Sequence, residues 1–245
     1  MMVRDEYSER QYRDVLPAYY QRKYGLNQPG DGADPEPDIR QFEPGDEPRL
    51  VDAYRTVWTQ EPWNEVFGLQ AAYDQVREAV APDSATALVA EPGDFSDRDV
   101  IDAVDYPEEP SYLLDGDEPA PDEERFFREL REPGIIGFTW ALDAREAGDV
   151  PETGGFDELV AEETAYISEL GVVPGYQSQG IGSRLSRELL DELEAEYDRV
   201  ILRTNPEAEK AINLYEQLGF ERTGLTDPEY EERVYLVKDL SEADG

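Results

Sequence analysis

Residues 174–185 read PGYQSQGIGSRL and follow the apolar run of residues 167–173. Gly180 and Gly182 stand one residue apart, between a strand-like segment and a helix-like one. Glycine lets another group approach the backbone where a Cβ would block it, and the first N–H groups of a helix attract anions because they lack partners within the helix. The N–H groups of residues 177–183 could therefore cradle a phosphate or pyrophosphate, or the glycines could serve only tight packing of strand on helix.

Two common phosphate-binding turns do not fit this segment. A Walker A loop needs Gly-Lys-Ser/Thr, and residues 174–185 contain no lysine. A dinucleotide-binding GxGxxG turn needs a third glycine at position 185, which is leucine.

The chain of 245 residues contains neither cysteine nor histidine. This composition excludes disulfides, thiolate nucleophiles, zinc–cysteine sites, Ser-His-Asp triads and histidine-ligated metals, and we expect no metal. Acid–base chemistry must come from carboxylates, tyrosine, lysine, the backbone or water.

The formal net charge is −37, and the acidic residues are spread along the chain. An acidic surface can attract cationic substrates, but we favour adaptation to a high-salt cytoplasm, as in a halophilic organism. The charge counts against nucleic-acid binding, which needs a basic face. No stretch approaches the ~18 apolar residues of a membrane span, and the N-terminus MMVRDEYSER is acidic where a signal peptide is apolar, so we expect a cytoplasmic protein without a membrane partner.

The composition predicts two parts of unequal size. Residues 1–38 are predicted to form a helical arm, at 5–24, followed by a Gly/Pro/Asp-rich linker. Residues 39–242 are predicted to form one globular domain, interrupted by an acidic, proline-rich insertion at about 91–132.

Apolar periodicity predicts a mixed α/β (α+β) fold with a sheet of six or seven strands and flanking helices. The expected strands are residues 39–42, 85–90, 134–142, 164–173, 199–204, 220–224 and 233–237. The expected helices are residues 48–58, 69–80, 182–197 and 205–218. The last helix has the clearest boundaries, with Asn205 as the N-cap, Pro206 in the first turn and Gly219 as the C-terminal stop.

Two motifs, in this order along the chain, and one strand upstream of them resemble the GNAT superfamily of N-acetyltransferases. Residues 177–182, QSQGIG, are similar to the Q/R-x-x-G-x-G/A loop that binds the acetyl-CoA pyrophosphate in that family. Residues 202–220, LRTNPEAEKAINLYEQLGF, resemble the family's next strand and helix, and residues 134–142, GIIGFTWAL, resemble its third strand. The resemblance is strong over residues 164–224 and weak over residues 39–142.

This resemblance implies a fold and a mode of cofactor binding. The sheet would be mostly antiparallel, and two central strands would splay apart so that the pantetheine of acetyl-CoA lies between them. The backbone of Leu170 and Val172 would bind the pantetheine and the thioester carbonyl, with Asn205 near the pantetheine arm. The pyrophosphate would lie on Gln177, Gln179, Gly180, Gly182 and Ser183.

Acetyl transfer needs one group that protonates the leaving thiolate and another that takes a proton from the amine. Tyr215 matches the family tyrosine that points at the sulfur, and a hydroxyl of reference pKa about 10 can protonate a thiolate of parent pKa about 8.5. The alternative is a core tyrosine beside Ile212 and Leu218. Without histidine, the base should be a carboxylate acting directly or through water. Glu169 is the candidate, although it could be one more acid of an acidic chain.

The acceptor site is predicted between the first two helices. Residues 61–68, EPWNEVFG, resemble a Pro-Trp-Asn segment found there in some members of the superfamily. Trp63 could stack on the acceptor, and Glu61 or Glu65 could hold its ammonium group. An ordinary core position for Trp63 is an equal alternative.

The sequence therefore predicts an acetyl-CoA-dependent N-acetyltransferase that transfers the acetyl group to a primary amine by direct attack in a ternary complex. The acceptor would be a small molecule, such as a polyamine, an amino acid or an aminoglycoside, or a protein N-terminus. The alternatives are a catalytically silent acyl-CoA-binding regulatory module and a nucleotide-binding protein that uses the same turn. The N-terminal arm could dock on its own chain or on a neighbour, which leaves a homodimer open.

Overall fold

A computed structural model describes most of the chain between residues 36 and 240. The described residues are 36–58, 63, 65, 67–82, 84–93, 134–148, 150–151, 155–160, 163–226 and 233–240. The predicted arm and nearly all of the predicted linker and insertion lie outside these ranges. Across the described ranges, no helix is long and apolar enough to cross a membrane.

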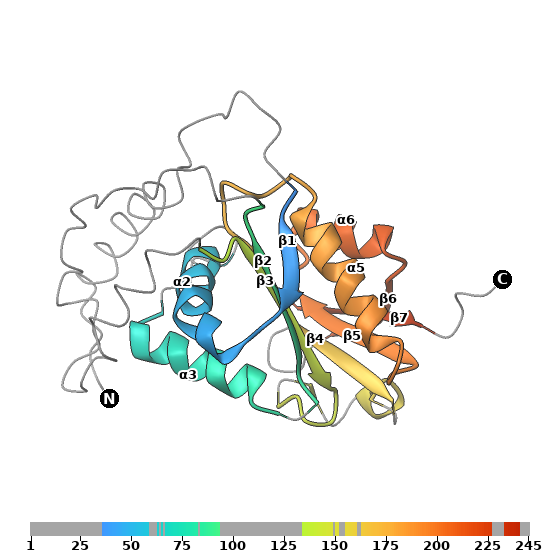
Figure 1. Cartoon of the computed structure of the whole chain (residues 1–245). Coiled ribbons are helices and arrows are strands. Elements are labelled where there is room, and N and C mark those ends of the chain that lie inside the picture. The colour runs from blue at the N-terminus through green and yellow to red at the C-terminus, as the bar shows by residue number, and fades with distance from the viewer. Residues whose placement is uncertain are drawn as a thin grey trace, which may run out of the picture. The chain divides into compact units, whose positions relative to one another are not determined.

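Seven strands form one mixed sheet with the order β1-β2-β3-β4-β5-β7-β6 (Figure 1). The strands are β1 (Asp38–Gln41), β2 (Thr86–Glu91), β3 (Gly137–Asp143), β4 (Thr164–Val172), β5 (Arg199–Thr204), β6 (Glu221–Thr226) and β7 (Val234–Asp239). β4 and β5 are parallel, whereas β7 is antiparallel to both β5 and β6. The prediction of a mixed, mostly antiparallel sheet is confirmed.

Within the described residues, four α-helices accompany the sheet, as the periodicity predicts. They are α2 (Glu47–Trp58), α3 (Leu69–Val80), α5 (Ile181–Leu193) and α6 (Glu209–Gln217), with short 3₁₀ turns η1 (Pro44–Asp46) and η4 (Phe156–Glu158). In α5, Leu185, Leu189 and Leu193 recur every four residues and are almost completely buried, so that one stripe of the helix faces the core. This helix ends at Leu193, four residues before the predicted end, and β3 begins at Gly137 rather than at residue 134.

The predicted start of α6 is wrong. The helix begins at Glu209, and its N-cap is Ala208 rather than Asn205. The Asn205 side chain instead accepts the backbone N–H of Glu207 at 2.9 Å, which closes a separate turn that contains Pro206 before the helix starts. The predicted end is confirmed, because Gly219 follows the helix with φ +87°, a left-handed conformation suited to glycine.

The chain divides into two compact units, which are described separately. Unit 1 comprises the described residues of Met1–Glu78, Val89–Gly137 and Gly171–Ile181. Unit 2 comprises those of Ala79–Leu88, Phe138–Leu170 and Gly182–Gly245. The glycine-rich turn before α5 thus belongs to unit 1, and the paired parts of β4 and β5 belong to unit 2 together with α6.

A network of two arginines and two carboxylates holds β1, η1, α2 and the end of β2 together in unit 1. Arg40 binds Asp46 at 2.6 Å and Glu91 at 2.8 Å. Arg49 binds Glu91 at 2.8 Å and also contacts Asp46. Burial alone would raise the pKa of the Asp46 carboxyl, but hydrogen bonds from Arg40 and from the Glu43 N–H hold that pKa below its ordinary value of 3.8. The network is locally neutral in a strongly acidic chain.

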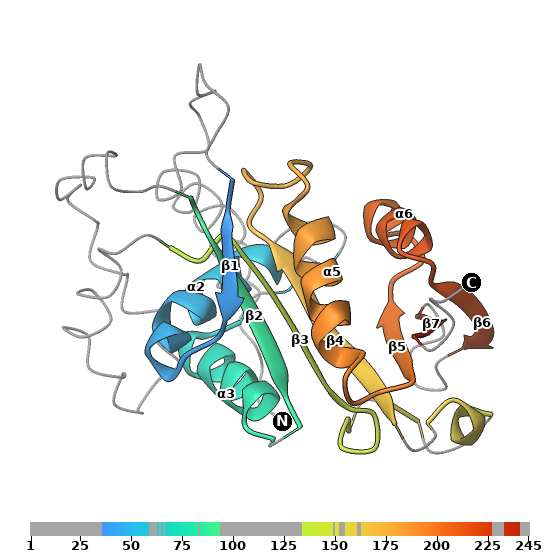
Figure 2. The same ribbon diagram turned by 45° about the vertical axis from the view of Figure 1, so that its right-hand side comes forward.

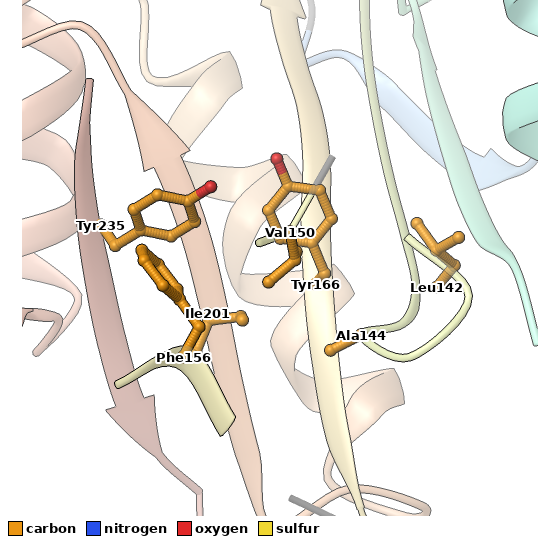
Figure 3. Packing of buried hydrophobic residues seen from close by; sticks show 7 residues of the cluster. All are labelled: Leu142, Ala144, Val150, Phe156, Tyr166, Ile201 and Tyr235. Atoms are coloured by element: carbon orange, nitrogen blue, oxygen red, sulfur yellow. The ribbon is translucent and has the colours of Figure 1, made fainter. Parts of the chain in front are cut away.

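The core of unit 2 contains a cluster of seven buried side chains, drawn in Figure 3. Tyr166 of β4, Ile201 of β5 and Tyr235 of β7 come from three neighbouring strands, and Phe156 meets the Tyr235 ring edge-on with 4.6 Å between ring centroids. The remaining members are Leu142, Ala144 and Val150. The cluster packs against β4 and β5 where these two strands are paired.

Candidate active site

β4 and β5 separate part of the way along their length. Their parallel ladder runs from Thr164 opposite Arg199 to Ile167 opposite Leu202 and, within the described strands, ends there. β4 nevertheless continues to Val172 and β5 to Thr204. Figure 2 shows the two strands side by side at their N-terminal ends and diverging beyond them. The predicted splay of the central strand pair is therefore present, and it opens within unit 2.

The hydrogen bonds on the β3 side of β4 give the physical reason for the splay. The Thr164 carbonyl oxygen faces β3, because it accepts the Ala144 N–H at 2.9 Å. The Glu169 carbonyl oxygen also faces β3, because it accepts the Thr139 hydroxyl at 2.8 Å. Backbone groups of a regular strand alternate sides, so residues five positions apart should face opposite ways. We infer one extra residue in β4 between these positions, a β-bulge, and such a bulge bends the strand and interrupts its pairing.

The glycine-rich turn in unit 1 is braced by its own glutamines. Gln177 donates its side-chain amide to the Val172 carbonyl at 3.0 Å, and Gln179 donates to the Gly175 carbonyl at 3.0 Å. Ser178 adopts a left-handed φ of 63°. The two glutamine side chains therefore shape the turn by binding backbone carbonyls.

At the end of this turn, open space at Gly180 lies next to the backbone N–H groups at the start of α5. Gly180 has φ +86°, and a Cβ built on it would meet nothing within 4 Å. α5 begins at Ile181, so Gly182 and Ser183 lie in its first turn, where the backbone N–H groups have no partner within the helix. An open approach beside such N–H groups, at the positive end of the helix dipole, fits a phosphate-bearing ligand.

Tyr215 lies on α6, 7% exposed, with its ring edge-on to Phe220 at 5.6 Å between centroids. Burial raises the pKa of the Tyr215 hydroxyl well above its ordinary value of 10, and the negative charge of Glu169 raises it further. The side chain is thus both a packed core residue and a hydroxyl that stays protonated at neutral pH, able to donate a proton or a hydrogen bond.

Glu169 lies late in β4 and is half-buried. Its charge acts on the pKa of Tyr215, so the two residues predicted to carry the proton transfers lie within electrostatic reach of each other in unit 2. Asn205 directly follows β5 and is half-buried, with its side-chain oxygen engaged in the turn before α6. Leu170 lies on the diverging part of β4, beyond the end of the ladder.

The segment predicted to bind the acceptor contributes an aromatic cluster to unit 1. Trp63 is half-buried, with its ring edge-on to Trp58 at 4.9 Å between centroids. Glu65 is exposed, and its backbone N–H donates to the Trp58 carbonyl at 2.8 Å. Glu61 lies outside the described residues.

Two buried polar residues near these segments escaped the sequence analysis. Arg55 is 1% exposed in α2 and donates its Nε to the Phe67 carbonyl at 3.2 Å. Thr139 is 1% exposed in β3 and binds the Glu169 carbonyl. A sequence signal existed for Thr139, because it is a hydroxyl residue inside the apolar run of residues 135–142.

Comparison with known proteins places the chain in a family. Residues 90–220 match the model of the Acetyltransferase (GNAT) family. The chain is 36% identical over 115 residues to N-alpha-acetyltransferase RimI of Mycobacterium tuberculosis, a match that covers 46% of this chain and 68% of the relative. The chain therefore belongs to the GNAT acetyltransferase family and is an acyltransferase.

Solved structures agree on the fold. PH1933 from Pyrococcus horikoshii OT3 superposes with a TM-score of 0.53 at 19% identity, over 83% of this chain and 98% of that one. The aminoglycoside acetyltransferase AAC(6')-Ib, in complex with coenzyme A, gives a TM-score of 0.54 at 20% identity, over 83% of this chain and 95% of that one. At these identities the likeness concerns the architecture.

Proposed function

We propose that the protein is an N-acetyltransferase that uses acetyl-CoA to acetylate a primary amine. The observation that carries the proposal is that the buried Tyr215 hydroxyl lies within electrostatic reach of Glu169, a carboxylate on the strand that diverges from β5, in a chain of the GNAT family. Acetyl-CoA supplies the acetyl group as a thioester, whose carbonyl carbon the amine attacks.

The chain offers two sets of cofactor-binding groups. Leu170 and Val172, on the diverging part of β4, bind the pantetheine and the thioester carbonyl through their backbone, and Asn205 contacts the pantetheine arm. The pyrophosphate lies on the turn and the first turn of α5, which supply Gln177, Gln179, Gly180, Gly182 and Ser183. Support comes from the open approach at Gly180 and the N–H groups of the helix start.

The chain's own residues move two protons. Glu169 takes a proton from the acceptor's ammonium group, directly or through water, so that the nitrogen lone pair can form the new C–N bond. Tyr215 gives its proton to the sulfur as the C–S bond breaks. The second proton of the nitrogen restores the Tyr215 hydroxyl, directly or through water, and Glu169 releases the first proton to solvent. An acetyl thioester and an ammonium ion thus become an amide, a thiol and one released proton. Backbone N–H groups on β4 stabilise the oxyanion.

The acceptor class that the comparisons favour is a polypeptide N-terminus, because the relative from Mycobacterium tuberculosis is named an N-alpha-acetyltransferase. Trp63 would stack on the acceptor, and Glu61 or Glu65 would hold its ammonium group. Small amines, namely polyamines, amino acids and aminoglycosides, are the competing acceptors.

Residues 39–242 form the catalytic domain of this proposal, preceded by the arm of residues 1–38. The setting is a high-salt cytoplasm, in keeping with a net charge of −37.

An acceptor screen tests the proposal. Protein in molar KCl receives acetyl-CoA with an alanine-initiated octapeptide, spermidine, alanine or kanamycin, and the released CoA thiol is measured. We expect the peptide to give the highest rate. Calorimetry with acetyl-CoA, ATP and NAD runs alongside it. Binding of acetyl-CoA without turnover of any acceptor would favour the silent acyl-CoA-binding module, and failure to bind acetyl-CoA would refute both functions.

A further inference from the structure

Thr139 is a buried hydroxyl in the otherwise apolar middle of β3. It is 1% exposed, and its neighbours Phe138 and Trp140 are buried as well. Valine has nearly the same shape, so packing alone does not require threonine at this position. The hydroxyl instead has one defined partner, the carbonyl oxygen of Glu169, at 2.8 Å across the strands.

That hydrogen bond holds the carbonyl end of the peptide unit between Glu169 and Leu170 and shows how this unit is oriented. In a trans peptide the C=O and the N–H point in opposite directions. Because the Glu169 carbonyl faces β3, the Leu170 N–H points away from β3 and toward β5. The β4–β5 ladder has already ended at Ile167 and Leu202, so this N–H faces the splay rather than a ladder partner.

This orientation of the peptide unit between Glu169 and Leu170 differs from that expected in a regular strand. Thr164 faces β3, so regular alternation would turn the Glu169 carbonyl toward β5 and the Leu170 N–H toward β3. The shift persists further along the chain, where the odd-numbered Val173 donates its N–H to the Ile136 carbonyl at 2.9 Å. Thr139 therefore hydrogen-bonds to β4 just beyond the extra residue, at a point where β4 is no longer paired with β5.

We propose that Thr139 is a positioning residue for acetyl transfer, whose hydroxyl holds the Leu170 N–H aimed at the acyl oxygen of the thioester. The proposal rests on the acetyltransferase function proposed above and assigns a task to a residue outside the motifs. An N–H donor whose orientation is fixed before the reaction stabilises the developing oxyanion charge without having to reorient. If the peptide unit could rotate, part of that stabilisation would be lost.

The test compares Thr139→Val, Thr139→Ser and Thr56→Val. Valine keeps the shape and removes the hydroxyl, and serine keeps the hydroxyl. Thr56 is a matched control, because it is 0% exposed and also donates its hydroxyl to a backbone carbonyl, that of Asp52, at 2.8 Å. With the best acceptor of the screen, Thr139→Val should lower kcat about 10-fold, a fraction of the loss on deleting an oxyanion donor. Thr139→Ser and Thr56→Val should remain within about 2-fold.

Affinity separates a positioning role from a structural one. Free CoA has no acyl carbonyl, so Thr139→Val should leave its Kd within about 2-fold while that of acetyl-CoA rises. Full kcat in Thr139→Val would overturn the proposal, as would an equal loss of affinity for CoA and acetyl-CoA or a failure of serine to restore the rate.

Amide exchange tests the same orientation without turnover. Acetyl-CoA should slow hydrogen–deuterium exchange at the Leu170 amide more than CoA does, and Thr139→Val should remove that difference. Equal protection by both ligands in the unsubstituted protein would refute the inference. If acetyl-CoA gives the extra protection but no acceptor is turned over, the proposed enzymatic function fails and the orientation stands.

Discussion

Tyr215 combines the packing of a core residue with a hydroxyl that is proposed to take part in the reaction. It is packed into the core of unit 2 and yet bears the hydroxyl predicted to reach the sulfur. Burial and the charge of Glu169 both raise its pKa, so tyrosinate does not form at neutral pH. An acid that does not ionise in the resting protein always holds the proton that it is to donate. Burial raises the pKa of a thiol as well, so a thiolate expelled in a buried site is a stronger base than in water and can take this proton as it forms.

Tyr215→Phe should lower kcat about 10²-fold, the scale of a lost general acid, with CoA affinity unchanged. Tyr197→Phe is the matched control, because Tyr197 is also a buried tyrosine of unit 2 but follows α5, and its loss should leave kcat intact. Steady-state kinetics and calorimetry give both quantities. Full activity of Tyr215→Phe would remove the tyrosine from the mechanism.

Glu169→Gln should lower the rate at pH 7 about 10²-fold. A carboxylate base works only when it is ionised, and an amide in its place cannot take the proton of the ammonium group. The variant has no carboxylate base and depends on hydroxide and on amine that is already deprotonated. Its rate should therefore approach that of the unsubstituted enzyme between pH 8 and pH 10. The measurement is kcat/KM against pH, with Glu194→Gln, an exposed glutamate in the turn after α5, as control for lost charge. Parallel profiles for enzyme and variant would assign the base to another group.

At the scale of elements, the turn before α5 depends on backbone conformation more than on side-chain chemistry. Its glutamines bind backbone carbonyls, and Gly180 is left-handed beside open space. Two costs of an added Cβ at Gly180 can thus be separated, namely the strain of a left-handed φ and the obstruction of a ligand.

Gly180→Ala should weaken CoA binding at least 10-fold. Gly224→Ala is the control, because Gly224 has φ +75° and likewise meets nothing within 4 Å of its Cβ position, but lies on β6. Each substitution carries a similar left-handed strain of about 1–2 kcal/mol. Calorimetry should show the affinity loss for Gly180→Ala alone. An equal loss in both variants would mean that strain, and not access to the turn, governs binding.

The elements themselves were largely predictable, because apolar periodicity and glycine stops are local signals. The leucines of α5 and the stop at Gly219 lie where the sequence placed them. The start of α6 was not predictable in this way, because Asn205 can cap a helix or close its own turn, and both choices use the same side-chain oxygen. The irregularity in β4 was beyond reach for another reason. It is recognised by the hydrogen bond between Thr139 and Glu169, 30 residues apart, which no local sequence pattern encodes.

The same limit applies to the candidate site. The GNAT-like motifs identified the glycine-rich turn and Tyr215 as candidates, because each of them lies within a short contiguous segment of the sequence. The acceptor segment contains Trp63, whose packing against Trp58 depends on where its loop folds back, and a sequence pattern does not determine that.

At the scale of the whole molecule, the net charge of −37 makes the few cations important. Arg40 and Arg49 both belong to the network around Asp46, which ties β1, η1 and α2 to the end of β2 in unit 1. Partly buried pairs are screened by salt much less than surface pairs, so this network keeps its strength where surface electrostatics fade.

Asp46→Asn should lower the free energy of unfolding by about 2 kcal/mol at pH 7. Glu216→Gln is the control, because its pair with Arg222 is about half exposed at both ends, and it should cost under about 0.5 kcal/mol. Urea unfolding measures both.

The pH dependence has a definite sign. The pKa of Asp46 is lowered by folding, so its contribution is complete above the ordinary value of 3.8 and is lost as pH falls through the folded value. The stability difference between the unsubstituted protein and Asp46→Asn should therefore narrow only in that acidic range. A constant difference down to pH 2 would show that Asp46 contributes through packing.

The divergence of β4 from β5 has a consequence for association between molecules. Beyond Ile167 and Leu202, two strands in the middle of a sheet present backbone groups that their neighbour does not pair, and such edges attract strands of other chains. Most sheet proteins protect only their outer edges, whereas this one has an additional edge inside. Dense carboxylates keep the surface hydrated even where salt screens their mutual repulsion. This hydration opposes the contact between copies that would make the inner edge a point of aggregation.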